Sequence, residues 1–136
     1  MKLNHARIKH FKGIASLEVD FQSADGMPRP ITALLGDNGS GKTTLLQAIA
    51  LTLSLATRRT RRPEELAWHG FLAERVSSMG VTAVELTVEL NSEEVALTSQ
   101  LFHEWDQSLS SDWRQTHRVV PPSDRRQVTL VYEKAG

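Results

Sequence analysis

The chain has 136 residues, of which 40% are hydrophobic and 24% are charged, and its formal net charge is zero. This length suits one domain with its own core, and the balanced charge does not favour a generally basic surface for nucleic acid. The sequence contains no cysteine, which excludes disulfides, thiolate zinc sites and a cysteine nucleophile. We expect a cytoplasmic protein, because no apolar run is long enough to span a membrane.

Two strands are predicted at the front of the chain. Residues 2–10 and 14–21 each mix apolar and polar side chains in alternation, and Lys12-Gly13 between them favours a turn. Residues 25–30 are rich in glycine and proline and are expected to form a loop. Residues 31–35 (ITALL) are a short apolar run, which predicts a buried central strand.

A helix is predicted from Lys42, because apolar residues recur at three- and four-residue spacing as far as Ala56. It carries no charge after Lys42, so we expect it to be buried on most sides. Four arginines follow, at positions 58, 59, 61 and 62. We interpret them as cations that complement the helix C-terminus and then lie in a solvated loop. Contact with DNA phosphates is the alternative.

The middle of the chain is expected to hold a second helix. Pro63-Glu64-Glu65 has the composition of a helix start, which predicts a helix over residues 64–77. Within it, Trp68-His69-Gly70-Phe71 is interpreted as an aromatic group that anchors the segment to the core, with a binding role as the alternative.

A hairpin is predicted in the second half. Residues 82–90 alternate clearly, and residues 91–94 are expected to turn the chain into another strand over 95–102. Residues 104–126 are polar and are expected to be rich in loops. Residues 128–132 predict a final strand.

The segment Gly36–Thr43 (GDNGSGKT) matches the phosphate-binding pattern G-x-x-x-x-G-K-[ST]. Its glycines permit backbone angles that turn successive N–H groups into one concave anion nest. The following helix adds free N–H groups and the positive end of its dipole. Lys42 offers positive charge to the β- and γ-phosphates, and Thr43 offers a hydroxyl to Mg²⁺. The sequence therefore predicts a nucleotide-phosphate site.

The loop and the residues before it resemble a particular family. The stretch Gly36–Leu46 resembles the ABC-type ATPase heads, and it looks nearest to the SMC/RecF-like, AAA-family ATP-binding proteins of DNA repair and phage defence. IKHFKGI (Ile8–Ile14) is similar to the opening of that family. The resemblance, carried by residues 1–57, implies an α/β P-loop NTPase fold: a mixed sheet with the P-loop helix and an antiparallel hairpin layer. We expect one domain over residues 1–136, the N-terminal lobe of a longer ATPase.

The resemblance also implies ATP and Mg²⁺ as ligands. Asn38 to Thr43 would wrap the triphosphate, with Lys42 on the β- and γ-phosphates and Thr43 on Mg²⁺. Thr44 would contact the α-phosphate. Lys12 stands where the family often has a basic residue near the nucleotide, and a solvated lysine at a strand end is the alternative. The predicted nucleotide-binding residues are Lys12, Gly36, Asn38, Gly39, Ser40, Gly41, Lys42, Thr43 and Thr44.

The residues that hydrolyse ATP in this family are not found in the sequence. The family has an apolar strand that ends in Asp-Glu, and the nearest segment here has Tyr132 in place of the aspartate. Glu133 is therefore interpreted as a solvated strand end, and no LSGG-like signature is present. We name no catalytic residue and expect a missing C-terminal lobe, or a second head, to complete the site.

Other functions stay open. A non-catalytic nucleotide-sensing or dimerisation module would need the same loop without hydrolysis. A small P-loop kinase or GTPase is less favoured, because no N-K-x-D motif is present. His69, His103 and His117 lie too far apart in the sequence to predict a metal site. DNA is kept as a candidate partner, and no contact with a membrane is expected.

Overall fold

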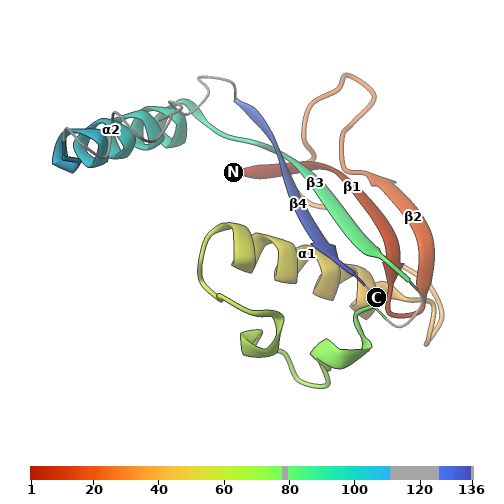
Figure 1. The fold of residues 1–136 in the computed structure, drawn as a ribbon. Coiled ribbons are helices and arrows are strands. Elements are labelled where there is room, and N and C mark those ends of the chain that lie inside the picture. Colours follow the sequence, from red (N-terminus) through yellow and green to blue (C-terminus); the bar gives the residue numbers. More distant parts are fainter. Residues whose placement is uncertain (78–79, 111–125, 136) are drawn as a thin grey trace.

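The computed structural model describes residues 1–77, 80–110 and 126–135. Four strands form one sheet in the order β2-β1-β3-β4, and all the pairings between them are antiparallel. They are β1 (Lys2–Phe11), β2 (Ile14–Asp20), β3 (Thr82–Glu89) and β4 (Gln127–Lys134). Helix α1 (Lys42–Ala56) lies across one face of the sheet, and helix α2 (Ser92–Ser108) projects away from it (Figure 1).

The core lies between α1 and the sheet. Strand β3 contributes every second residue, because side chains of a strand point alternately to the two faces. Helix α1 contributes residues at three- and four-residue spacing, which share one side of the helix. The buried apolar residues of this core are Ala6, Ile8, Phe11, Phe21, Leu45, Ala48, Leu51, Val76, Val84, Leu86 and Val88.

The backbone of β1 changes conformation near its end. Its pairing with β2 keeps one register from His5–Asp20 to Phe11–Ile14, but His10 has a left-handed φ of 50°. The buried positions of β1 alternate as far as Ile8 and then pass to Phe11. Phe11 enters the core, where it is fully buried.

Several predicted elements are confirmed. Strands were expected over residues 2–10, 14–21, 82–90 and 128–132, and a helix was expected from Lys42 to Ala56; all five are present with bounds within a few residues. The helix is buried on one side only, however, and not on most sides. Leu46 is 44% exposed, because the described residues cover only the side of α1 that faces the sheet.

Residues 31–35 do not form the predicted strand. Ile31 and Leu35 are 84% and 92% exposed, although the apolar run predicts burial. A strand needs a neighbour to accept and donate its backbone hydrogen bonds. No described strand pairs with this segment, so the predicted mixed sheet is antiparallel throughout the described part of the chain.

The predicted helix over residues 64–77 is also wrong. The segment contains only two 3-10 turns, Pro63–Glu65 and Ala73–Arg75. Between them Gly70 takes a φ of 73°, a left-handed conformation that ends helices. The expected anchoring is confirmed for Phe71, which packs against the core.

The predicted strand over residues 95–102 is part of helix α2. The Asn91 side chain accepts the Glu94 N–H at 2.8 Å, and the Glu94 carboxylate accepts the Asn91 N–H at 2.8 Å. This reciprocal pair is a capping box, which starts a helix where a turn was expected. Strand β3 pairs instead with β4, from Thr82–Lys134 to Glu89–Gln127.

The expected loop over residues 104–126 belongs to α2 as far as Ser108. Residues 111–125, which include His117, lie outside the described residues. Among the described helices, none has both the length and the apolar composition that crossing a membrane requires.

Candidate phosphate-binding site

The loop Gly36–Gly41 leads into α1 and is open to solvent. Gly39 and Gly41 have φ values of 84° and 90°, in the left-handed region that L-residues rarely adopt. A Cβ atom on Gly36 would lie 2.8 Å from the Ser40 Oγ atom, so the Ser40 side chain would have to move. The predicted requirement for glycine therefore has a backbone cause at Gly39 and Gly41.

The N-terminus of α1 has no cap from a side chain. Its N-cap is Gly41, and its first turn contains no acidic residue. A serine, aspartate or asparagine at this position would accept one of the free N–H groups of the first turn. Here these N–H groups and the positive end of the helix dipole are left for an external anion.

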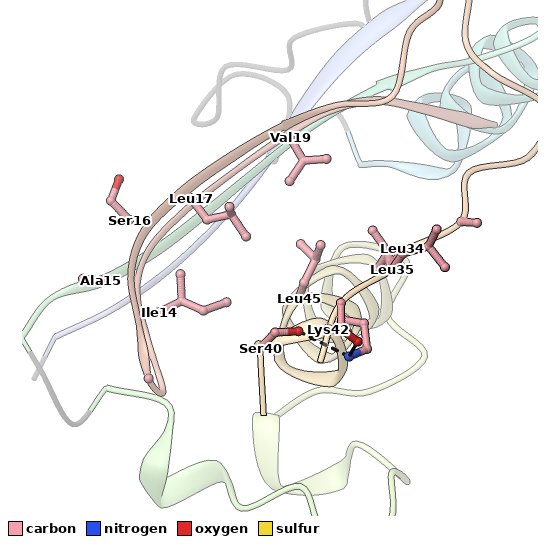
Figure 2. Close-up of a pocket in the computed structure, with 14 residues that line it drawn as sticks. Ile14, Ala15, Ser16, Leu17, Val19, Leu34, Leu35, Ser40, Lys42 and Leu45 are labelled. Atoms are coloured by element: carbon pink, nitrogen blue, oxygen red, sulfur yellow. Dashed lines mark hydrogen bonds between the residues drawn. The ribbon is translucent and has the colours of Figure 1, made fainter. Parts of the chain in front are cut away.

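Lys42 is folded back on the loop. Its Nζ atom donates to the carbonyl oxygens of Gly36 and Asp37, each at 2.6 Å, and to Ser40 Oγ at 3.2 Å. Figure 2 shows the ammonium group of Lys42 close to Ser40. All of its partners belong to the loop itself, so phosphate oxygens can replace them without breaking any contact with the core.

The other predicted residues of the loop gather around a small cavity. This cavity has a volume of about 220 Å³. Its lining residues are Asn38, Gly39, Gly41, Lys42, Thr43 and Thr44. Thr43 is exposed, and its hydroxyl has no hydrogen-bond partner among the described residues. The structure thus places six of the predicted loop residues around one cavity, whereas Gly36 and Ser40 line the larger cavity beside it.

Lys12 lies elsewhere. Its Nζ atom donates to Gln47 Oε1 at 2.8 Å and stands 5.2 Å from the centroid of the Phe71 ring. Partial burial lowers the pKa of Lys12, and the charge of Arg75 lowers it further. No hydrogen bond joins Lys12 to the loop within the described residues. Sequence reasoning does not single out Gln47, although a polar residue on the buried side of an apolar helix is a usable signal.

A larger apolar cavity lies next to the loop. It has a volume of about 660 Å³ and is walled by Ile14, Leu17 and Val19 of β2 and by Leu34 and Leu35 on the opposite side (Figure 2). Ile14, Leu17, Val19 and Leu34 also pack against the core, so the cavity continues the apolar interior towards the loop.

The residues of the loop fit a nucleoside triphosphate better than a metal ion held by protein ligands alone. No group of three or more His, Cys, Asp or Glu side chains able to hold a metal occurs in the described ranges. Thr43 is then the single predicted protein ligand for Mg²⁺. The remaining ligands of the ion would be phosphate oxygens and water, which Mg²⁺ accepts readily.

Comparison with known proteins identifies the family. The AAA domain family matches residues 6–127, which is most of the chain. The chain belongs to the AAA domain family. This AAA domain shows the predicted resemblance to the N-terminal region of SMC/RecF-like proteins, and the α/β P-loop NTPase fold class is confirmed.

The relatives are much longer than the AAA domain. This chain is 35% identical to the DNA replication and repair protein RecF of Synechococcus sp. (strain JA-2-3B'a(2-13)) over 96 residues. The matched region covers 68% of this chain and 23% of that protein. It is 40% identical to the Septu protein PtuA of Bacillus mycoides (strain KBAB4) over 68 residues. That matched region covers 47% of this chain and 10% of that protein. The chain therefore spans about a quarter of the length of its first RecF relative.

Proposed function

We propose that this AAA domain binds ATP, together with Mg²⁺, through Gly36–Thr44. The observation that carries the proposal is the start of α1. A helix N-terminus without a side-chain cap stands beside a lysine whose ammonium is held only by loop oxygens. Positive charge and free N–H groups thus converge on one small cavity, and a polyphosphate is the anion that matches it.

Each loop residue has a role in this proposal. The N–H groups from Asn38 to Thr43 hold the phosphates, and Lys42 exchanges the loop carbonyls for oxygens of the β- and γ-phosphates. The Thr43 hydroxyl holds Mg²⁺, and Thr44 contacts the α-phosphate. Bound Mg-ATP supplies the phosphoanhydride bond, while this chain binds and orients it.

We also propose that the domain is the N-terminal lobe of a longer cytoplasmic ATPase that acts in DNA repair or phage defence. Two observations support this proposal. The chain spans about a quarter of its first RecF relative, and the apolar residues Ile31 and Leu35 are exposed beside a large apolar cavity. Hydrolysis would need residues of the other lobe or of a second head. A non-catalytic nucleotide-sensing or dimerisation module is the alternative.

Isothermal titration calorimetry of Mg-ATP binding to wild type and to Lys42→Ala tests the phosphate site. We expect at least tenfold weaker binding by the variant, which corresponds to about 1.4 kcal/mol. Lys9→Ala removes the same charge from an exposed position on β1 and should bind as wild type does. Equal affinity of Lys42→Ala and wild type would contradict the assignment.

Two further measurements address the other parts of the proposal. Multiple-turnover hydrolysis by the 136-residue chain, if abolished by Lys42→Ala, would contradict the division of the site between two lobes. Weaker ATP binding by Lys12→Ala would assign Lys12 as a nucleotide contact. Unchanged binding would leave Lys12 with its structural contacts to Gln47 and Phe71.

A further inference from the structure

A second group of positive charges lies at the other end of α1. The helix has 15 residues, so about 21 Å separates its two ends, at about 1.5 Å per residue. A cavity of about 440 Å³ opens just beyond its C-terminus. It is lined by Leu55, Arg58, Thr60 and Arg61.

The arginines are not needed to cap the helix. The Thr57 N–H donates to the Leu53 carbonyl at 2.9 Å, and the Thr57 hydroxyl donates to the same oxygen at 2.7 Å. The Arg58 N–H donates to the Leu55 carbonyl at 3.1 Å, and Arg58 has a left-handed φ of 56° that permits this ending. Backbone groups and a threonine therefore satisfy carbonyls that we expected the arginine side chains to complement.

Most of the guanidinium groups are free. Arg58, Arg59 and Arg61 have no side-chain hydrogen bond or ion pair within the described residues. Arg62 pairs with Glu65 at 3.3 Å, and Glu65 also accepts the Arg61 N–H at 2.7 Å. Glu65 thus fixes the course of the loop, and its charge is taken up by Arg62.

Thr60 adds a donor of another kind. Its Oγ1 atom is buried and has no hydrogen-bond partner in the described part of the chain. A buried hydroxyl without a partner is unfavourable, so such a group in a native structure calls for an explanation. An oxyanion in the cavity would provide the missing acceptor, because rotation about χ1 moves the hydroxyl between three staggered positions.

We propose that Arg58, Thr60 and Arg61 bind a phosphate group of a nucleic-acid backbone. Guanidinium groups match phosphate oxygens in charge and geometry. Arg59 and Arg62 continue the positive charge along the same loop, which suits the row of phosphates in a polymer better than a single ion. This site is separate from Gly36–Thr44 and does not depend on ATP binding there.

Binding of a labelled DNA duplex of about 20 base pairs, measured by fluorescence anisotropy at several salt concentrations, tests the proposal. All variants carry Lys42→Ala, which removes the main charge of the ATP site. We expect Arg58→Ala/Arg61→Ala to weaken binding at least tenfold and to reduce the salt slope by about 2. Arg29→Ala removes an exposed arginine outside the cavity and should change the affinity less than about twofold.

Thr60→Val distinguishes a specific phosphate site from nonspecific attraction by the arginine charges. The variant keeps the charge and the shape of the cavity but removes the hydroxyl. We expect it to weaken DNA binding several-fold. The free variant should unfold at the same temperature as the parent or at a higher one, since it loses an unsatisfied buried group. The proposal would be overturned if Thr60→Val and Arg58→Ala/Arg61→Ala both bound DNA as tightly as the Arg29→Ala control.

Inorganic phosphate distinguishes the two sources of the oxyanion. If phosphate raises the unfolding temperature in a way that Thr60→Val abolishes, while DNA affinity is the same in every variant, the cavity holds free oxyanions and the backbone assignment is wrong. With Lys42 intact, Arg58→Ala/Arg61→Ala should bind Mg-ATP as wild type does. This control keeps a failure at one site distinct from a failure at the other.

Discussion

Gly41 joins two requirements at a single residue. It is the N-cap of α1, and its φ of 90° and ψ of 5° place it in the left-handed region. Space is not the constraint, because a Cβ atom would meet only Ile14 Cγ1, at 4.0 Å. The backbone conformation is the constraint, and it is the one that turns the loop N–H groups towards an anion.

Gly41→Ala should therefore destabilise the protein by about 1–2 kcal/mol, the cost of a left-handed L-residue. It should also weaken Mg-ATP binding, because the loop relaxes. Urea unfolding and ATP titration measure the two effects. Gly13→Ala is the matched control, since a methyl group there would have no atom within 4 Å and no left-handed φ is required. Similar stability of the two variants would show that the conformation of Gly41 is not a constraint.

Residues whose roles follow from local chemistry could be predicted from the sequence. The glycines, Lys42 and Thr43 form a motif within eight consecutive positions, and their chemistry depends on the backbone around them. Gln47 and Thr60 could not be predicted in the same way. Their significance depends on partners, or on a missing partner, that only the folded chain reveals.

At the scale of elements, α2 depends on its cap more than on packing. None of its residues is buried, and helices in proteins take most of their stability from the packing of a buried face. The Glu94 carboxylate is held by the N-terminal ammonium of Met1 at 2.5 Å and by the Asn91 N–H. These two contacts, the ammonium first, lower the pKa of Glu94.

The lowered pKa of Glu94 predicts a dependence of α2 on pH. A carboxyl group with a lower pKa in the folded state adds stability above its unfolded pKa, and this stability is lost as the pH falls through the folded pKa. Glu94→Gln should therefore reduce the helical circular-dichroism signal at neutral pH. The difference from wild type should shrink as the pH falls below the unfolded pKa of a glutamate and vanish once the pH is below the lowered folded pKa of Glu94. Glu93→Gln, in the same turn, is the control. A difference that persists in acid would contradict this role of the charge.

The errors at this scale have a common physical origin. The capping box at Asn91 and the left-handed Gly70 each override the apolar pattern of the neighbouring residues. Residues 31–35 have the composition of a strand but no neighbour with which to pair among the described strands. Alternation predicts a strand well where a partner exists, as β1 and β3 demonstrate.

In the whole molecule, one face of the sheet is covered by α1, whereas the segment beside the phosphate loop is exposed to solvent. Helix α1 packs on the sheet and Leu34 packs against the core, whereas Ile31, Leu35 and the adjacent apolar cavity stay open. In the described chain, no backbone acceptor is present for the N–H groups of residues 31–35. The apolar character of this segment is evident from the sequence, but its lack of a partner among the described strands is seen only in the structure.

Hydrogen exchange should reveal this difference. In the 136-residue chain, the amides of residues 31–35 should exchange almost as fast as in an unfolded peptide, while those of β3 should be strongly protected. In a longer protein that includes the proposed second lobe, residues 31–35 should become protected. If the amides of residues 31–35 were as strongly protected as those of β3 in the 136-residue chain, this segment would not be open to solvent.

The β3–β4 pairing has a consequence for where the chain can be altered. The two strands match without interruption from Thr82–Lys134 to Glu89–Gln127, and the Leu90 N–H donates to the Arg126 carbonyl at 2.6 Å. Helix α2, which follows Leu90, contributes no buried residue, so the described core does not depend on it. A reporter joined to the exposed surface of α2 should therefore leave the phosphate loop and its geometry unchanged.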